Sequence, residues 1–246
     1  MTPLLHGHGL MLPGRLLESE ISVNAGELVC LIGPNGSGKT SLLHALAGIG
    51  TPEGTVDVSD LPVKGLHPDR RQRLLSFLPA SRQVKWPLLS GDLIKLGLPS
   101  DADAGAVATL IDELDLRHFL DRRVDRLSTG ERSRVLIARA LAADPRIVLL
   151  DEPIANLDPL WQLRMMDYLR SRARRGDRAV LMAVHDLETA RLYADRLIIM
   201  DGGRIAADGA PEVLLLGPHI PAVFGVERVE SAWRPARPLA DRRSSQ

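Results

Sequence analysis

The fold class is indicated most clearly by residues 28–47, which read Leu28-Val29-Cys30-Leu31-Ile32, then Gly33-Pro34-Asn35-Gly36-Ser37-Gly38-Lys39-Thr40, then Ser41–Ala47. An apolar run, a G-x-x-x-x-G-K-[ST] loop and a helical segment follow one another directly, as a phosphate-binding loop requires. The glycines let the backbone turn tightly so that its N–H groups point at an anion, and the following helix adds its positive end. We therefore expect this loop to bind nucleotide phosphates, with Lys39 as a point charge and Thr40 as a ligand for Mg²⁺.

A second apolar run, Ile147 to Leu150, ends in two carboxylates, Asp151 and Glu152. Adjacent residues on a strand point to opposite sides, so the two acids need not do the same work. We assign Asp151 to the metal and Glu152 to the attacking water as general base. Two acids this close repel each other and raise the pKa of one of them, which suits a base.

Short apolar runs alternate with helix-length segments along the whole chain, which is the pattern of an α/β fold with a largely parallel sheet. Further strands are expected at residues 74–78 and 179–184. Residues 196–207, with a turn at Asp201-Gly202-Gly203, are expected to form a hairpin near the end of the core.

The composition changes between residues 85 and 144, where we expect a mainly helical insertion. One helix face there is predicted by apolar residues at i, i+3, i+4 and i+7, which are Val107, Leu110, Ile111 and Leu114. We expect one domain over residues 1–230, with an α/β core at about 1–84 and 145–226. Residues 231–246, rich in Arg, Pro and Ser, are expected to form a frayed tail.

Composition excludes several classes of protein. Thirty-one basic and 31 acidic residues give no net charge, so no whole-chain field attracts nucleic acid or anionic lipid. The single cysteine, Cys30, excludes an internal disulfide and fits a reducing compartment. No run of about 18 uncharged apolar residues is available to span a bilayer. No aromatic residue precedes Phe77, so the N-terminal region has no ring on which to stack a base.

The segment Leu127-Ser128-Thr129-Gly130-Glu131 resembles the signature sequence of the ATP-binding cassette (ABC) ATPases, which usually reads Leu-Ser-Gly-Gly-Gln. The resemblance covers about residues 10–226. It implies a P-loop NTPase core with a mainly parallel sheet, an N-terminal antiparallel β portion and an inserted helical subdomain. It also implies a head-to-tail homodimer in which the signature of one subunit contacts the ATP held by its partner, through Ser128, Thr129, Gly130 and Glu131.

The same resemblance implies roles for two further positions. His185 resembles the switch histidine that contacts the γ-phosphate in this family. Ala80 stands where the family carries a glutamine that touches Mg²⁺. Either Gln83, three residues further along, or another group or water completes the metal shell.

The family commonly stacks the adenine of ATP on an aromatic residue before the P-loop, and this chain has none there. Met11, Leu12 or Leu17 is expected to provide apolar contact instead. We therefore predict weak ATP affinity and poor discrimination between ATP and GTP.

Trp86-Pro87-Leu88-Leu89 and the ending Val223-Phe224-Gly225-Val226 resemble the importers of iron-siderophore, haem and cobalamin. The implied protein is a Mg²⁺-dependent ATPase that uses ATP to power import of a metal chelate. Its partners would be a second copy of the chain, two integral-membrane permease subunits and an external substrate-binding protein, with no nucleic acid. The implied location is cytoplasmic, on the inner face of the cell membrane. Trp86 is expected to anchor the helical insertion, to contact a permease helix, or both.

Three alternatives stay open from the sequence. The chain resembles, less closely, the ATPases of other importers and of exporters. A non-transport ABC ATPase acting on ribosomes or DNA would use the basic stretches Arg70–Arg73 and Arg170–Arg178. A protein that binds nucleotide without hydrolysing it is suggested by Ala80 and Thr129. His6 and His8 are expected to be loop residues.

Overall fold

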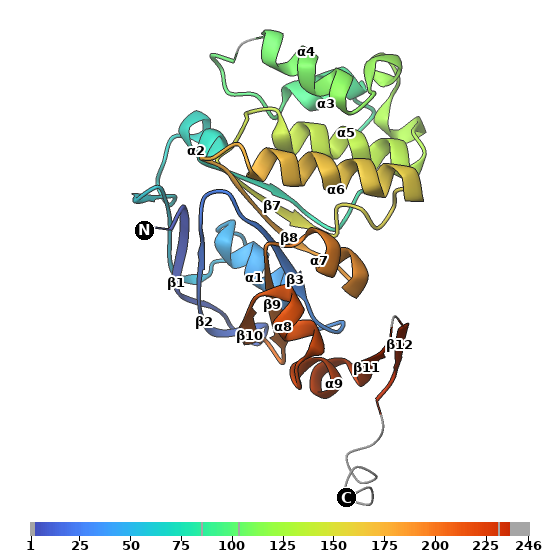
Figure 1. The fold of residues 1–246 in the computed structure, drawn as a ribbon. Coiled ribbons are helices and arrows are strands. Elements are labelled where there is room, and N and C mark those ends of the chain that lie inside the picture. Colours follow the sequence, from blue (N-terminus) through green and yellow to red (C-terminus); the bar gives the residue numbers. More distant parts are fainter. Residues whose placement is uncertain (1–2, 85, 103, 231, 237–246) are drawn as a thin grey trace, which may run out of the picture.

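A central six-stranded sheet organises the molecule, with strand order β10-β9-β3-β8-β7-β6 (Figure 1). The structure is a computed structural model and describes residues 3–84, 86–102, 104–230 and 232–236. The parallel strands are β3 (Leu28–Ile32), β6 (Leu75–Leu78), β7 (Ile147–Asp151), β8 (Ala179–Ala183) and β9 (Arg196–Asp201), and β10 (Arg204–Gly209) is antiparallel to β9. Parallel strands bring their carboxyl ends to one edge, so the segments that follow β3, β6, β7 and β8 meet there.

The remaining elements surround this sheet. The other strands are β1 (Leu5–Leu12), β2 (Leu16–Val23), β4 (Glu53–Val58), β5 (Leu61–Pro62), β11 (Val226–Val229) and β12 (Ala232–Pro235). The α-helices are α1 (Lys39–Leu46), α2 (Pro68–Leu74), α3 (Ser90–Lys95), α4 (Ala104–Glu113), α5 (Thr129–Leu141), α6 (Pro159–Ala173), α7 (Leu187–Tyr193), α8 (Pro211–Leu216) and α9 (His219–Phe224), and the 3-10 helices are η1 (Arg117–Phe119) and η2 (Val124–Arg126).

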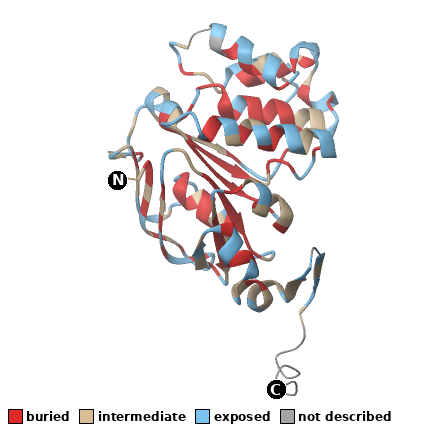
Figure 2. Ribbon diagram, viewed as in Figure 1, coloured by how far each residue is buried: buried red, intermediate tan, exposed pale blue. Residues whose placement is uncertain are grey.

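The central strands are buried on both faces and separate two hydrophobic cores (Figure 2). In β3, Leu28, Cys30 and Ile32 face the core that contains α5 and α6, whereas Val29 and Leu31 face the core that contains α1. This burial explains the continuous apolar runs in the sequence, because a parallel strand covered on both sides has no polar face. The expected α/β fold with a largely parallel sheet is confirmed.

A second, antiparallel sheet with order β2-β1-β4-β5 covers the outer side of α1. The helix therefore lies between two sheets, with Leu42, Leu43 and Leu46 fully buried. Each fully buried leucine contributes about 1.5–3 kcal/mol relative to an exposed one. The helix that follows the phosphate-binding loop is thus rigidly held. The expected N-terminal antiparallel portion is confirmed.

Helices occupy the segment between β6 and β7, and α3, α4 and α5 gather at one end of the molecule (Figure 1). Three of the four residues expected on one helix face, Val107, Leu110 and Leu114, are buried there. Trp86 is 71% exposed, so it does not anchor this helical part. None of the helices in the described ranges is long and apolar enough to cross a membrane. The division into an α/β core and a helical subdomain stays a prediction.

The expected frayed tail differs from the structure where it is described. Residues 232–235 form β12, which pairs antiparallel with β11. The Trp233 side chain packs against the main core, and its Nε1–H donates to Glu188 at 3.0 Å. The packing of the Trp233 ring and the pairing of β12 with β11 hold these residues in place, although their polar composition suggested fraying. Residue 231 and residues 237–246 of the expected tail lie outside the described residues.

Candidate active site

A cavity of about 520 Å³ opens where β3, β7 and the β1–β2 turn come together. The P-loop and the β1–β2 hairpin contribute most of the lining, together with Glu152 and two glycines after β9. The lining residues are Gly14, Arg15, Leu16, Leu17, Asn35, Gly36, Ser37, Gly38, Lys39, Thr40, Ser41, Glu152, Gly202 and Gly203. Six of the eight P-loop residues predicted to bind phosphate therefore line one cavity.

The P-loop backbone is compact because it is built around glycines. Gly38 precedes α1 with φ of +104°, and a Cβ there would lie 3.0 Å from the Gly203 Cα. A Cβ at Gly33 would lie 2.4 Å from the Met200 carbonyl oxygen, so no larger residue fits. No side chain caps α1, which leaves its first-turn N–H groups directed at the cavity. An anion in the cavity would satisfy them.

Lys39 is almost fully buried and points back over its own loop. Its Nζ donates to the carbonyl oxygens of Gly33 at 2.6 Å and Pro34 at 3.1 Å. Burial lowers the pKa of Lys39, and the nearby carboxylates of Glu152 and Asp151 oppose that shift. The ammonium is thus a cation held in the wall of the candidate phosphate site.

Asp151 ends β7 and is fully buried, and neither of its carboxylate oxygens has a hydrogen-bond partner. Burial raises the pKa of this carboxyl more than the neighbouring charge of Glu152 does, and the Thr40 side chain opposes the rise. The sequence had suggested that repulsion between the acids would raise a pKa to suit a base. This raised pKa belongs to the residue proposed to hold the metal, and burial is its main cause. Two orphaned oxygens beside a threonine hydroxyl suit a hard cation such as Mg²⁺.

Glu152 follows directly and has a strained backbone, with φ of +52°. A non-glycine residue in this region costs about 1–3 kcal/mol and persists where its surroundings fix it. Its N–H donates to the Ala183 carbonyl at 3.2 Å, and its carboxylate lies 2.5 Å from His185 Nε2. The two residues predicted to act on water and the γ-phosphate are therefore in direct contact.

Arg82 is a part of this site that the sequence reasoning missed. It lies in the loop after β6, is 6% exposed, and donates from Nη2 to the carbonyl oxygens of Asp151 and Glu152, each at 3.0 Å. Burial lowers the pKa of its guanidinium, and Asp151 and Glu152 oppose the shift. Its Nε and Nη1 have no partner. One sequence feature could have identified it: Arg82 stands four residues after a predicted parallel strand, and it therefore lies at the sheet edge where the two acids also lie.

Buried polar atoms without partners concentrate at this edge of the sheet. Of the eight such side-chain atoms found in the described residues, five belong to Ser37, Asp151 and Arg82. Each unsatisfied buried group costs about 1–3 kcal/mol. A fold that leaves so many unpaired in one place is built to bind a polar, charged ligand there.

The candidates Ala80 and Gln83 lie on either side of Arg82 and are both exposed. Neither lines the cavity. The role of Gln83 as a metal ligand stays a prediction, and Arg82 is the residue of this loop that reaches the acids.

The β1–β2 hairpin contributes Arg15, from its turn, and Leu17, from β2, to the lining of the cavity. Leu17 is 56% exposed and lines the cavity, as expected of an apolar contact for a base. Leu12 is buried in the core, and neither it nor Met11 is among the lining residues. The guanidinium of Arg15 adds a planar cation, a group that stacks on bases.

The signature residues lie apart from the cavity, at the start of α5. Ser128 caps the helix: the Glu131 N–H donates to the Ser128 Oγ at 3.3 Å, and the Ser128 N–H donates to the Glu131 carboxylate at 2.7 Å. Ser128 and Thr129 are exposed, and a Cβ on Gly130 would lie 3.2 Å from the Asn156 carbonyl oxygen. The four residues do not line the chain's own cavity, and two of them, Ser128 and Thr129, are exposed at the start of the helix.

Comparison with known proteins gives a consistent result. A family model described as ABC transporter matches residues 16–155. A hemin import ATP-binding protein (HmuV) of Nocardia farcinica is 39% identical over 210 residues, covering 82% of this chain and 73% of the relative. A cobalamin import ATP-binding protein (BtuD) of Halobacterium salinarum is 37% identical over 246 residues, covering 94% of this chain. This chain spans 62% of the length of that cobalamin relative.

Solved structures agree on the fold. An ATP-binding subunit of an ABC transporter superimposes with a TM-score of 0.76 at 24% identity, covering 84% of this chain and 90% of that one. A dimeric ATP-binding cassette in a post-hydrolysis state, bound to ADP and Pi, gives 0.72 at 25% identity, covering 84% and 98%.

Proposed function

The chain belongs to the ABC transporter family, and from this premise we propose that it is the ATP-hydrolysing subunit of an importer. The observation that carries the proposal is the group of buried, unpartnered polar atoms on Ser37, Asp151 and Arg82 beside the contact between Glu152 and His185. A P-loop alone would support nucleotide binding. A paired base and histidine beside an orphaned carboxylate support hydrolysis as well.

In this proposal Gly33 to Thr40 hold the phosphates of ATP, with Lys39 released from the loop carbonyls to meet them. The Thr40 hydroxyl and the Asp151 carboxylate hold Mg²⁺, whose chemistry is to neutralise charge on the phosphate oxygens. The two unpartnered oxygens of Asp151 support this assignment. Binding the ion also removes the cost of burying that carboxylate without a partner.

Glu152 acts as the general base in this scheme. A water between Glu152 and the γ-phosphate gives its proton to the carboxylate while its oxygen attacks phosphorus. The bond from phosphorus to the bridging oxygen breaks, leaving ADP and inorganic phosphate. The contact with His185 at 2.5 Å keeps the carboxylate facing the reaction, and the histidine can also contact the γ-phosphate.

Arg82 is proposed as a positioning residue for that base. Its Nη2 bridges the carbonyls of Asp151 and Glu152, and so fixes the strained turn that carries both acids. In the related family this loop carries a glutamine, whereas here the position is Ala80. The fixed charge of Arg82 and its two unpartnered nitrogens make it the part of the loop that responds to the nucleotide.

Two copies of the chain are proposed to close over two ATP molecules. The signature residues Ser128, Thr129, Gly130 and Glu131 lie outside the chain's own cavity, so the site lacks them until a partner supplies them. The exposed N-terminus of a 13-residue helix supports contact with a phosphate across the dimer.

A metal chelate such as haem or cobalamin is proposed as the cargo, and iron-siderophore belongs to the same chemical class. The relatives named for hemin and cobalamin import support this choice. The proposed partners are two membrane permease subunits and an external binding protein, which place the chain on the inner face of the cell membrane. The exposed ring of Trp86, four residues after Arg82, supports contact between this loop and a permease helix.

The basic stretch Arg170–Arg178 favours this assembly over a nucleic-acid complex. Arg172 and Arg178 pair with Asp144, while Arg170 and Arg174 pair with Asp195. Arginines neutralised by neighbouring acids make a weak phosphate-binding surface.

Affinity purification of the tagged chain from detergent-solubilised cells tests the proposal. We expect two membrane proteins to be recovered with the wild type, and less of them with Trp86→Ala. Leu216→Ala, which removes an equally exposed side chain on α8, is the matched control and should not change recovery. Recovery of nucleic acid without any membrane protein would overturn the transporter assignment.

A further inference from the structure

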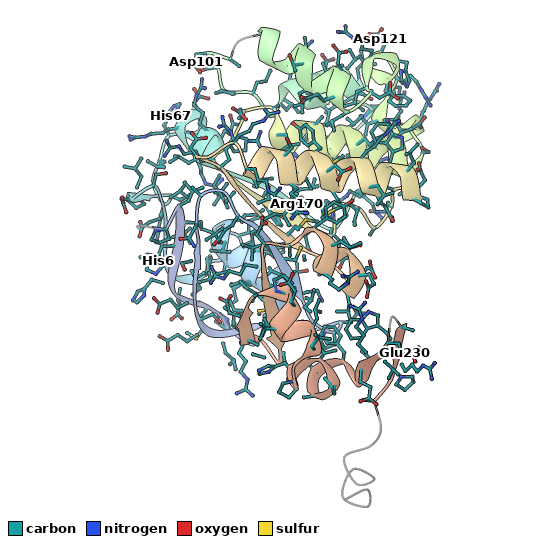
Figure 3. The ribbon with its side chains drawn as sticks, viewed as in Figure 1. His6, His67, Asp101, Asp121, Arg170 and Glu230 are labelled. Carbon is teal, nitrogen blue, oxygen red and sulfur yellow. The ribbon has the colours of Figure 1, made fainter. Side chains whose placement is uncertain are left out.

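Two histidines and a glutamate form a cluster on the outer face of the N-terminal sheet. His6 and His8 lie on β1, not in a loop as the sequence suggested, and Glu20 lies on β2. The loop expectation failed because the glycines flanking them, Gly7 and Gly9, suggested a break. In the structure β1 continues through both glycines: Gly7 pairs on each side of the strand, and the register of both ladders shifts around Gly9. His6 lies at the periphery of the molecule (Figure 3).

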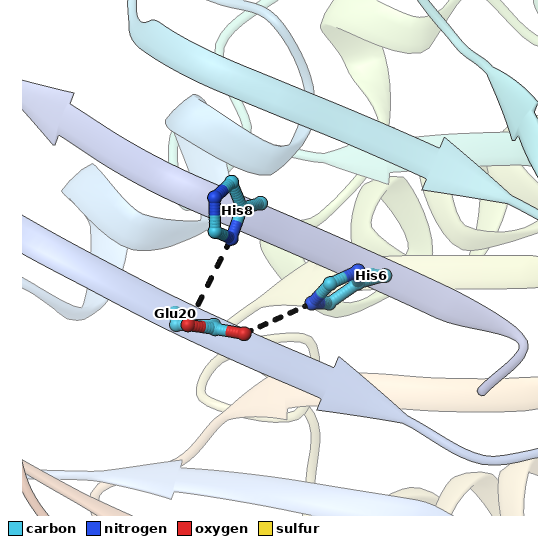
Figure 4. A group of neighbouring side chains, drawn as sticks. All are labelled: His6, His8 and Glu20. Carbon is cyan, nitrogen blue, oxygen red and sulfur yellow. Dashed lines mark hydrogen bonds and ion pairs between the residues drawn. The ribbon is translucent and has the colours of Figure 1, made fainter. Parts of the chain in front are cut away.

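The strand register explains why the three side chains meet. His6 and His8 are two residues apart on one strand, so they share a face. His6 pairs with Ser22, and Glu20, two residues from Ser22 on β2, therefore points to the same face of the sheet as His6. The pairing of β1 with β2 shifts between Gly7 and Leu10, and the contacts of Glu20 with both histidines show that the three side chains still meet there. A single carboxylate can therefore reach both imidazoles (Figure 4).

The interatomic distances are close to those of a metal site. His6 Nε2 lies 3.2 Å from Glu20 Oε1, and His8 Nδ1 lies 3.8 Å from Glu20 Oε2. One ligand atom from each residue lies within 4.8 Å of the others. Bonds of 2.0–2.2 Å to a tetrahedral ion separate its ligands by about 3.4 Å. Small rotations of exposed side chains are sufficient to reach that separation.

The surroundings favour a cation. On the other side of β1, Asp57 is the register partner of His6 and therefore lies on the same face of the sheet. The nearby Arg196 does not compete, because its guanidinium makes two hydrogen bonds of 2.6 Å to Asp208. His8 and Glu20 are more than half exposed, so a hydrated ion has direct access.

We propose that His6, His8 and Glu20 form a Zn²⁺ site on the β1–β2 hairpin. Two imidazoles and one carboxylate suit Zn²⁺, whereas Mg²⁺ and Ca²⁺ prefer oxygen ligands throughout. Three protein ligands leave a fourth position for water. The site is separate from the proposed Mg²⁺ ligands Thr40 and Asp151, so its test does not depend on ATP hydrolysis.

The position of this site gives zinc a structural consequence. The ion joins β1 to β2, and this hairpin supplies Arg15, from its turn, and Leu17, from β2, to the nucleotide cavity. Zinc therefore stiffens the hairpin that carries the outer wall of that cavity. Because only the folded hairpin assembles the ligands, zinc stabilises the folded chain by mass action.

Zinc titration of the chelator-treated full chain, in competition with a chromophoric chelator, tests the site. We expect one Zn²⁺ per chain, retained in the presence of excess Mg²⁺, and a thermal midpoint that rises with zinc concentration. His8→Ala and Glu20→Gln should each weaken zinc binding by at least ~10-fold. His118→Ala is the matched control, because it removes an exposed histidine 3.7 Å from a single carboxylate on Asp115 and should leave binding unchanged.

The variants distinguish a site from a simple ion pair. His6, His8 and Glu20 are surface residues, so unchanged basal ATPase activity will verify that their variants fold. Zinc uptake that persists in a His6→Ala, His8→Ala double variant would overturn the proposal. Failure of the wild type to bind Zn²⁺ in competition with the chelator would do the same, and would show that Glu20 merely pairs with the histidines.

Discussion

The site contains two buried cations, Lys39 after β3 and Arg82 after β6, at the same edge of the sheet. The structure holds them in place in different ways. β3 is followed by the P-loop, and Lys39 begins a helix packed between two sheets. β6 is followed by an irregular loop that buries Arg82. Lys39 donates to carbonyls five and six residues away, whereas Arg82 donates to carbonyls 69 and 70 residues away. In the proposed site, the first cation is placed at the phosphates by local structure, and the second is placed at the backbone of the two acids by tertiary structure.

The largest effect is expected on the β3 side. Lys39→Ala removes the charge that stabilises the phosphates, so hydrolysis should fall by at least roughly 10³-fold. ATP binding should weaken in the same variant, as measured by equilibrium titration. Lys64→Ala, at a lysine outside the cavity, should retain both properties. Substantial remaining turnover in Lys39→Ala would place the phosphates elsewhere.

On the β6 side, Arg82→Ala should separate catalysis from binding. Loss of the bridge frees the strained Glu152 turn and misplaces the base, so kcat should fall by roughly 10²-fold. The affinity for ATP, which depends on the P-loop, should change little. Gln83→Ala changes the neighbouring exposed residue and should leave the rate unaltered. If Gln83→Ala lowers the rate and Arg82→Ala does not, then Gln83, and not Arg82, is the residue of this loop that supports catalysis.

Asp151 is close to both cations, and its ionisation should affect the thermal stability of the protein. Folding raises the pKa of its carboxyl, so the folded state binds that proton more tightly than the unfolded state. The stabilisation from this group is present at low pH and is lost as pH rises through the raised pKa. At neutral pH, Asp151→Asn should therefore raise the thermal midpoint without nucleotide, and it should remove the extra stabilisation by Mg²⁺ with ATP. A lower midpoint in calorimetry would contradict a destabilising buried charge.

The smallest effect is expected at the outer wall of the cavity. Leu17→Ala should weaken nucleotide binding by roughly 1 kcal/mol, about 5-fold in Kd. Met11→Ala, at a residue outside the lining, should have no effect. ATP and GTP should compete almost equally for the wild type. A strong preference for ATP would show that polar groups of the chain read the adenine.

These differences also define what a sequence can reveal. The P-loop, Asp151 and Glu152 are recognisable because their chemistry depends on neighbours in sequence, and the family assignment rests on the same local motifs. Arg82 was missed because its partners are distant in sequence and its loop has no regular pattern. The His6, His8 and Glu20 cluster needs a strand register, which alternating glycines concealed. The strand at 232–235 depends on Trp233 packing against a core built from other segments.

The most direct test of the account is a comparison of the wild type with Glu152→Gln in the presence of Mg²⁺ and ATP. Glutamine is close in shape to glutamate but does not accept the proton from water. The account predicts that the wild type releases phosphate, whereas the variant binds ATP, forms a stable dimer by light scattering and releases almost none. Phosphate release by the variant at the wild-type rate would contradict Glu152 as the base, and an equally inactive wild type would indicate a protein that binds ATP without hydrolysing it.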